Sequence, residues 1–154
     1  MKKFKLVVAA FVLAGLTLTS CSSDDNSTST PVEITGKWTP TKTVIKIGAN
    51  QEVSEDYANN QEGCDKDYVE FSATNSVFKD KYFYKNGANA CIEDDAAAPG
   101  TFNKSNDVLI INADESNYDG TYKVTTLSNS TLVISFDTQV GTNTVTTSYH
   151  FSKV

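Results

Sequence analysis

Between residues 34 and 154, apolar and polar residues alternate with the two-residue period of a β-strand, and no long stretch shows the period of a helix. In the C-terminal run, Val145, Tyr149 and Phe151 share one face of the expected strand, and His150 falls on the other. Similar β-branched and aromatic runs recur, separated by Gly, Asn, Asp and Ser. We therefore expect eight strands, at 34–47, 68–72, 76–84, 101–104, 108–112, 120–127, 131–137 and 143–153.

The links between these runs predict how the strands connect. Three short links, at 73–75, 105–107 and 128–130, have the length and composition of hairpin loops. Two others, 48–67 and 85–100, are longer. Strands joined mostly by hairpins predict an all-β domain, an eight-stranded antiparallel up-and-down β-barrel, because closure removes the exposed edges. An open two-sheet sandwich is the alternative.

The first 20 residues do not follow this alternation. Lys2, Lys3 and Lys5 precede an uncharged, mostly apolar run over residues 6–18, which is the pattern of a secretory signal peptide. As a helix this run would span roughly 20 Å, whereas the hydrocarbon core of a bilayer is ~30 Å thick. The pattern therefore favours a signal peptide over a membrane-spanning anchor.

The apolar run ends in Leu18-Thr19-Ser20-Cys21, which resembles the lipobox of bacterial lipoproteins. In that motif, small residues precede a cysteine that is acylated and becomes the first residue after cleavage. The resemblance implies a lipoprotein signal peptide over 1–20 and a lipid anchor at Cys21, with an ordinary signal and a chance cysteine as the alternative. Each buried acyl methylene contributes roughly 0.8 kcal/mol, so a multiply acylated cysteine binds a membrane stably.

Residues 21–33 are polar and contain no aromatic residue, so we expect a flexible tether. The Ser-Ser-Asp-Asp run at 22–25 resembles the signal that sends some Bacteroidota lipoproteins to the outer face of the outer membrane. The expected location is therefore the outer membrane, with the domain anchored by lipid and facing either the periplasm or the cell surface.

With Cys21 assigned to lipid, Cys64 and Cys91 remain. An even pair in an exported chain favours a disulfide, which would tie the two long links together. The alternative is a reactive or metal-binding thiol pair. Neither cysteine lies in a CxxC motif, and the only histidine is 59 residues beyond Cys91.

Composition excludes several classes of function. All 13 basic residues are Lys, and residues 21–154 hold 10 of them against 19 acidic residues, a net charge of −9. Such a chain lacks the cationic surface that supplies most of the affinity for nucleic acid, so no nucleic-acid partner is expected. The only histidine, His150, falls on a face of Ser and Thr where we expect it to be solvated, and no spacing selects a catalytic trio. We therefore expect no enzyme activity, no cofactor and no metal.

The two long links are rich in acidic residues. Such runs are usually solvated surface, and a Ca²⁺ site between the links is the alternative. The residues concerned are Glu52, Glu55, Asp56, Glu62, Asp65 and Asp67 in one link and Glu93, Asp94 and Asp95 in the other.

Gly36-Lys37-Trp38 on the first expected strand is similar to the start of the lipocalin family, in which the Trp closes one end of an eight-stranded barrel. The whole chain also resembles the lipocalin-like lipoproteins of Bacteroidota. The matching residues are Cys21, Gly36, Trp38, Cys64, Cys91, the run Gly100-Thr101-Phe102 and the run Tyr149-His150-Phe151. This resemblance implies a lipocalin-like barrel over 34–154.

The sequence departs from the lipocalin pattern at one point. Lipocalins usually pack an Arg from the last strand over the Trp, and this chain contains no Arg. Lys153 and His150 are the residues of the last strand that can take this place, although neither offers the same planar stack.

Large apolar residues decide what the barrel can hold. An eight-stranded barrel is either filled by its own side chains or wide enough for one small apolar ligand, and both alternatives stay open. The candidates for the interior are Trp38, Phe71, Phe78, Tyr82, Phe102, Ile110, Tyr122, Ile134, Phe136, Tyr149 and Phe151, and all except Trp38 and Ile110 are also candidate ligand-lining residues.

Two hypotheses for function follow. The first is a non-catalytic cell-envelope lipoprotein that holds a small hydrophobic ligand in its barrel, where apolar burial supplies affinity and Tyr hydroxyls supply orientation. The second is an outer-membrane interaction module with a filled barrel, which binds a protein or glycan through its acidic loops.

Overall fold

Ten β-strands dominate the part of the chain that the structure, a computed structural model, describes: residues 31–49, 51–94 and 98–154. They are β1 (Gly36–Ile47), β2 (Gln51–Asp56), β3 (Tyr68–Ser72), β4 (Val77–Lys85), β5 (Cys91–Asp94), β6 (Gly100–Ser105), β7 (Val108–Asn112), β8 (Gly120–Leu127), β9 (Thr131–Val140) and β10 (Asn143–Lys153). One 3-10 turn, Thr74–Ser76, connects β3 to β4. These ranges contain no helix with the length and hydropathy that a membrane span requires. The expected signal peptide, Cys21 and most of the tether lie outside the described residues.

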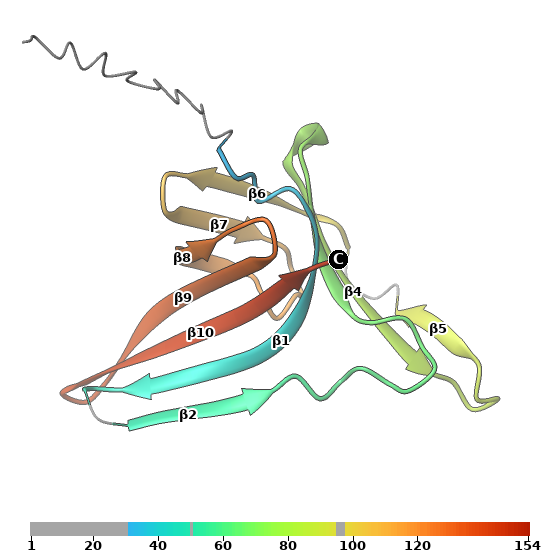
Figure 1. The fold of residues 1–154 in the computed structure, drawn as a ribbon, viewed down its shortest axis with the longest axis horizontal. Coiled ribbons are helices and arrows are strands. Elements are labelled where there is room, and N and C mark those ends of the chain that lie inside the picture. Colours follow the sequence, from blue (N-terminus) through green and yellow to red (C-terminus); the bar gives the residue numbers. More distant parts are fainter. Residues whose placement is uncertain (1–30, 50, 95–97) are drawn as a thin grey trace, which may run out of the picture. The chain divides into compact units, whose positions relative to one another are not determined.

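Eight of the described strands close into an antiparallel barrel. The hydrogen-bonded order is β1, β3, β4, β6, β7, β8, β9 and β10, and β10 pairs back onto β1 (Figure 1). The closing ladder between β1 and β10 is long, running from Trp38 opposite Lys153 to Ile47 opposite Val145. The predicted eight-stranded up-and-down barrel is therefore confirmed, and the alternative of an open sandwich is wrong.

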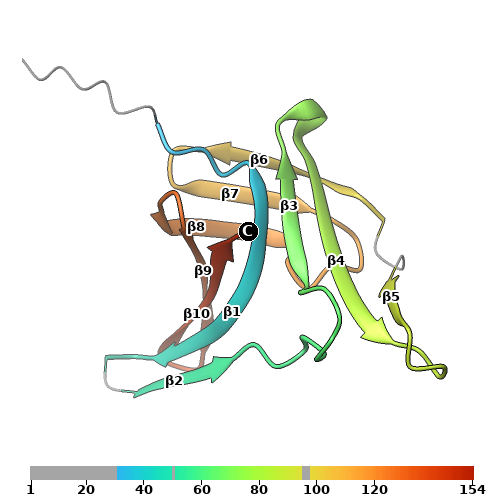
Figure 2. The same cartoon turned by 45° about the vertical axis from the view of Figure 1, so that its right-hand side comes forward.

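Two further strands, β2 and β5, lie in the long links where the sequence predicted only loops. β2 pairs with the second half of β1, and β5 pairs with the second half of β4. Figure 2 shows β5 beyond β4, on the side away from β1. Every residue of β2 is exposed, so it shows no alternation, and β5 has only four residues, too few for its alternation to be recognised in the sequence.

The barrel is closed at one end by Trp38, which is fully buried. Its indole Nε1 donates a hydrogen bond to the carbonyl oxygen of Ile34 at 2.6 Å. The Lys153 ammonium lies 4.8 Å from the centre of the Trp38 ring, so Lys153, and not His150, takes the place of the lipocalin Arg. Gly36 makes room for the Lys153 side chain, because a Cβ at this position would lie 3.0 Å from Cε of Lys153. The φ of +119° at Gly36 also favours glycine.

The hydrophobic core fills the barrel around Trp38. Its buried members come from most strands of the barrel and from the segments that flank them: Ile34, Trp38, Val69, Phe71, Phe78, Phe102, Leu109, Ile111, Ala113, Tyr118, Tyr122, Leu132, Ile134 and Phe151. Ile110 was expected inside but is 38% exposed, because β7 directs Leu109 and Ile111 inward. A shift of one residue reverses the two faces of a strand, and the apolar run 108–111 has no polar residue to mark them.

The barrel has its shortest ladder between β4 and β6. Only two residue pairs join these strands, Val77 with Thr101 and Phe78 with Gly100. Gly100 lies against the end of β7 and the residue that follows it: an added Cβ would meet the carbonyl oxygen of Asn112 and would lie 2.7 Å from Cα of Ala113. A residue without a side chain is therefore required where β4 and β6 meet.

We expect Gly100→Ala to lower the free energy of unfolding by about 2–3 kcal/mol, because the clash is with backbone, which cannot move aside as a flexible side chain would. Urea unfolding followed by the fluorescence of Trp38 measures the change. Gly87→Ala is the matched control, since nothing lies within 4 Å of a Cβ there, and it should stay within about 0.5 kcal/mol of wild type. Equal stabilities of the two variants would show that β6 approaches Ala113 less closely.

Candidate functional site

Eight of the nine residues predicted to line a ligand cavity divide into two groups. Phe71, Phe78, Phe102, Ile134 and Phe151 are all buried within the core. The Phe71 ring packs against the rings of Phe78 and Phe102, with centroids 5.3 and 5.1 Å apart. These five side chains therefore fill the barrel and do not line a cavity.

The second group lies further along the strands from Trp38. Tyr122, Phe136 and Tyr149 line a cavity of about 180 Å³, together with Asn117, Asp119, Gly120 and Thr121. The Tyr122 ring contacts Phe136 edge-on at 5.7 Å, and Tyr149 lies about 6 Å from both. Three of the predicted lining residues are therefore brought together around one cavity.

Tyrosine hydroxyls make this part of the interior amphipathic. Burial raises the pKa of Tyr118, Tyr122 and Tyr149 above the usual tyrosine value. Their hydroxyls therefore stay protonated at physiological pH and can donate hydrogen bonds beside the ring faces.

Tyr82, another predicted lining residue, belongs to a polar cluster on the inner face of β4. Its hydroxyl donates to Oδ2 of Asp80 at 2.8 Å, and Ser116 Oγ donates to the same oxygen at 2.7 Å. Asn117 Nδ2 donates in turn to the Tyr82 hydroxyl at 3.2 Å. These bonds attach the loop between β7 and β8 to β4 across the interior. The sequence pattern missed this cluster, although an acid at the inward position between Phe78 and Tyr82 was a signal for it.

Asp80 is 4% exposed, and its burial raises the pKa of the carboxyl, an effect that the Ser116 and Tyr82 hydroxyls oppose. Folded Asp80 therefore holds its proton more tightly than the unfolded chain does. The contribution of Asp80 to the free energy of unfolding should therefore fall as the pH rises from the unfolded pKa, about 3.9, through the folded pKa, and stay lowered above it.

We expect Asp80→Asn to remove this pH dependence, since its amide oxygen still accepts a hydrogen bond but carries no charge. The difference in the free energy of unfolding between the variant and wild type should therefore be more favourable to the variant at neutral pH than at pH about 3.5. Urea unfolding at a series of pH values measures this difference. Parallel stability curves for the two proteins would contradict the assignment.

The acidic residues of the long links do not share one environment. Asp67 is 2% exposed, which corrects the expectation that it is solvated. It accepts hydrogen bonds from the Tyr57 hydroxyl at 2.7 Å and from the backbone N–H of Phe83 at 2.8 Å. A cavity of about 410 Å³ adjoins it, lined by Ala58, Asn59, Gln61, Asp67, Tyr82, Phe83, Tyr84 and Asp94.

Other acids of these links stay on the surface. Glu52, Glu55 and Asp56 are exposed along β2, and Asp95 lies outside the described residues. Among the described residues, no group of three or more His, Cys, Asp or Glu side chains is arranged to hold a metal ion.

Cys64 and Cys91 form a disulfide with their Cα atoms 5.4 Å apart, as predicted. It joins the segment that leads into β3 to the first residue of β5. Asp65 and Lys66 directly follow Cys64, and Glu93 is two residues after Cys91. The bridge therefore holds these charged residues in place beside the barrel wall.

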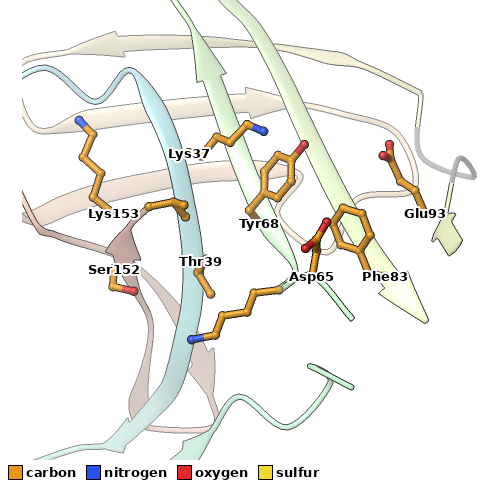
Figure 3. A pocket seen from close by; sticks show the side chains of 10 residues that line it. Lys37, Thr39, Asp65, Tyr68, Phe83, Glu93, Ser152 and Lys153 are labelled. Carbon is orange, nitrogen blue, oxygen red and sulfur yellow. The ribbon is translucent and has the colours of Figure 1, made fainter. Parts of the chain in front are cut away.

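A cavity larger than the two described above lies on the outside of the barrel (Figure 3). It has a volume of about 580 Å³ and is lined by Lys37, Thr39, Asp65, Lys66, Tyr68, Phe83, Glu93, Ser152, Lys153 and Val154, a set that we call the outer groove. Lys37 and Thr39 flank the inward-facing Trp38, and Tyr68 precedes the inward-facing Val69, so the floor is the outer face of the wall. The sequence did not predict this groove, because its residues come from five separate strands, from the link before β3 and from the residue after β10.

A closed eight-stranded up-and-down barrel, with a Trp at one end and an aromatic cavity further along, has the architecture of barrels that bind small ligands. The chain belongs to the lipocalin-like domain family, whose model matches residues 34–134. No curated protein matches the chain. The family fold is typically a non-catalytic binding fold, so membership suggests a role in binding a small ligand.

Proposed function

We propose that this protein is a non-catalytic lipoprotein of the outer membrane that binds a small hydrophobic ligand between Tyr122, Phe136 and Tyr149. The cavity of about 180 Å³ between these residues carries the proposal. It lies beside a filled core, and its three aromatic rings are available for an apolar ligand to pack against.

The size of the cavity limits the ligand. An engineered apolar cavity of about 150 Å³ holds one benzene molecule, so the space here suits one ring or a short stretch of acyl chain. Asn117, Asp119 and Thr121 line the cavity with the aromatic rings, so a ligand with one polar group at an end matches it best.

Native mass spectrometry of the protein purified from its own host tests this function. A co-purifying lipid or metabolite would support it. Indole, a small aromatic probe, should then shift the NMR signals of Tyr122 and Tyr149. The Phe136→Ala variant should retain the fold but bind indole with a changed affinity. Tyr84→Ala is the control, because Tyr84 is an exposed aromatic residue outside this cavity. A clean apo mass, together with no effect of indole, would contradict the proposal.

The cellular location rests on the lipobox-like run that ends at Cys21. Cys21→Ser should abolish the incorporation of labelled palmitate and release the protein from the membrane fraction. Protease treatment of intact cells separates the two orientations, since only a domain at the cell surface should be digested. Full membrane retention of the serine variant would contradict the lipid anchor.

The second candidate is an interaction module that binds a protein through its acidic surface. The exposed strand β2 favours it, since Glu52, Glu55 and Asp56 lie beside Val53, which is 52% exposed. Within the part of the chain that the structure describes, one edge of this strand pairs with no other strand, and a strand of a partner could add there. Cross-linking in intact cells should then capture a partner with wild type and lose it when these three acids are replaced by their amides.

A further inference from the structure

The outer groove is richer in lysine than the rest of this acidic domain. Three of the ten lysines in residues 21–154 line it, Lys37, Lys66 and Lys153, in a segment whose net charge is −9. Of the two acids in the lining, Glu93 is paired with Lys81. The lining thus holds three lysines against two acids, Asp65 and Glu93, a small positive excess in an acidic domain, which favours an anionic ligand.

The three lysines are held differently. Lys37 Nζ lies 4.2 Å from the centre of the Tyr68 ring, and Lys153 Nζ lies 4.8 Å from the centre of the Trp38 ring. Both ammonium groups are therefore positioned by aromatic rings. Among the described residues, Lys66 has neither an ion pair nor a ring contact, so its ammonium is available to a ligand.

Two aromatic rings form the floor of the groove. The rings of Tyr68 and Phe83 lie 6.1 Å apart and are tilted by 35°, and both are partly exposed. Figure 3 shows them side by side, with Lys37 beside Tyr68 and Glu93 beyond Phe83. Thr39 and Ser152 add hydroxyl groups to the lining. A matching ligand therefore has a ring with an apolar face, hydroxyl groups and an anionic substituent.

We propose that the outer groove is a second binding site, separate from the barrel interior, for a sugar that carries a carboxylate or phosphate group. An acidic sugar combines an apolar ring face for Tyr68 and Phe83, hydroxyls for Thr39 and Ser152, and a charge for Lys66 and Lys37. The volume of about 580 Å³ lies within the range of small-molecule sites, roughly 300–1,000 Å³, and accommodates one or two sugar rings. This site does not depend on the ligand proposed for the interior.

Calorimetry and NMR titration of the full-length chain test the proposal with four probes: digalacturonic acid, neutral galactobiose, glucose 1-phosphate and inorganic phosphate. At least one anionic sugar should bind and shift the signals of Tyr68 and Phe83. Galactobiose and inorganic phosphate should each bind at least about tenfold more weakly, because each lacks one of the two required features. Binding of digalacturonic acid alone would identify the carboxylate as the anionic group, and binding of glucose 1-phosphate alone would identify the phosphate.

Lys66→Gln should weaken binding of the anionic sugar about fivefold, as expected for the loss of one exposed charge pair. Lys46→Gln is the matched control, since Lys46 is exposed on the same barrel wall but lies outside the groove. Phe83→Ala should weaken binding of both anionic sugars further. The proposal is overturned if no probe binds, if inorganic phosphate binds as tightly as the sugar, or if Lys46→Gln and Lys66→Gln have equal effects.

Discussion

Trp38→Ala should lower the free energy of unfolding by about 3–5 kcal/mol, the range found when a large aromatic side chain is removed from a core. The Trp38 side chain is fully buried and is the largest in the core. Its loss would leave a cavity at the point where β1 pairs with both β3 and β10. Collapse to fill that cavity is hindered because Trp38 lies between two ladders that close the barrel.

The Trp38 side chain also interacts with two polar groups, through one hydrogen bond and one cation–π contact. Without the indole Nε1, the carbonyl oxygen of Ile34 loses its hydrogen-bond donor, and the Lys153 ammonium loses the ring beneath it. Trp38→Phe separates these contributions, because it keeps an aromatic ring but cannot donate. We expect it to cost about 1–3 kcal/mol, from the missing hydrogen bond and the smaller ring.

Chemical denaturation followed by far-ultraviolet circular dichroism measures both variants without relying on Trp fluorescence. Val108→Ala is the control, since Val108 is 42% exposed, and it should change the stability by no more than about 0.5 kcal/mol. A Trp38→Ala protein as stable as this control would mean that the barrel end is loosely packed.

The alternation of apolar and polar residues was sufficient to predict the barrel. Every strand of the closed barrel carries inward-facing apolar residues, and this is the feature that a period of two detects. β2 was missed because all its residues are exposed, so its pairing with β1 leaves no mark in the hydrophobic pattern. Ile110 was placed inside by a shift of one residue in a run that is apolar throughout.

The buried polar groups show a second limit of sequence reasoning. Asp67 and Asp80 occupy inward positions, and each is compensated by hydrogen bonds from residues distant in sequence, such as Tyr57 or Ser116. The sequence analysis named Asp67 among the acids of a long link and did not single out Asp80. It gave the hydrogen-bond partners of neither, because these partners are brought together only by the closed fold. The outer groove could not be predicted for the same reason.

The aromatic residues of the interior show a third limit: the sequence identifies candidate residues but does not assign each one a role. The sequence left open whether they fill the barrel or line a cavity, and the structure divides them between the two roles. Phe71 and Phe78 pack ring against ring, whereas Tyr122 and Phe136 border a cavity. The difference comes from their height in the barrel, which depends on the registers of the ladders and not on residue type.

Removal of the disulfide by Cys64→Ala and Cys91→Ala together should lower the free energy of unfolding by about 3–4 kcal/mol, from the entropy that the unfolded chain gains when the loop is opened. The bridge spans a sequence separation of 27 residues and ties β5 to the segment before β3. Among the described strands, β5 pairs with β4 alone and is not one of the eight that close the barrel, so the double variant should keep the circular dichroism of the barrel. Urea unfolding measures the loss, and wild type under reducing conditions is the control, since it should unfold with the double variant.

The same variant tests whether the bridge shapes the outer groove. Lys66 and Glu93 each lie two residues from a bridged cysteine, whereas Tyr122 and Phe136 are in a different part of the barrel. At temperatures where the variant is fully folded, NMR shifts should therefore be large at Lys66 and Glu93 and small at Tyr122 and Phe136. Equal NMR shifts in both regions would mean that the bridge affects the structure of the whole barrel and not that of the groove in particular. Shifts confined to the groove would mean that the barrel folds without the bridge and that the bridge fixes the groove, because the wall ladders from β6 to β10 contain neither cysteine.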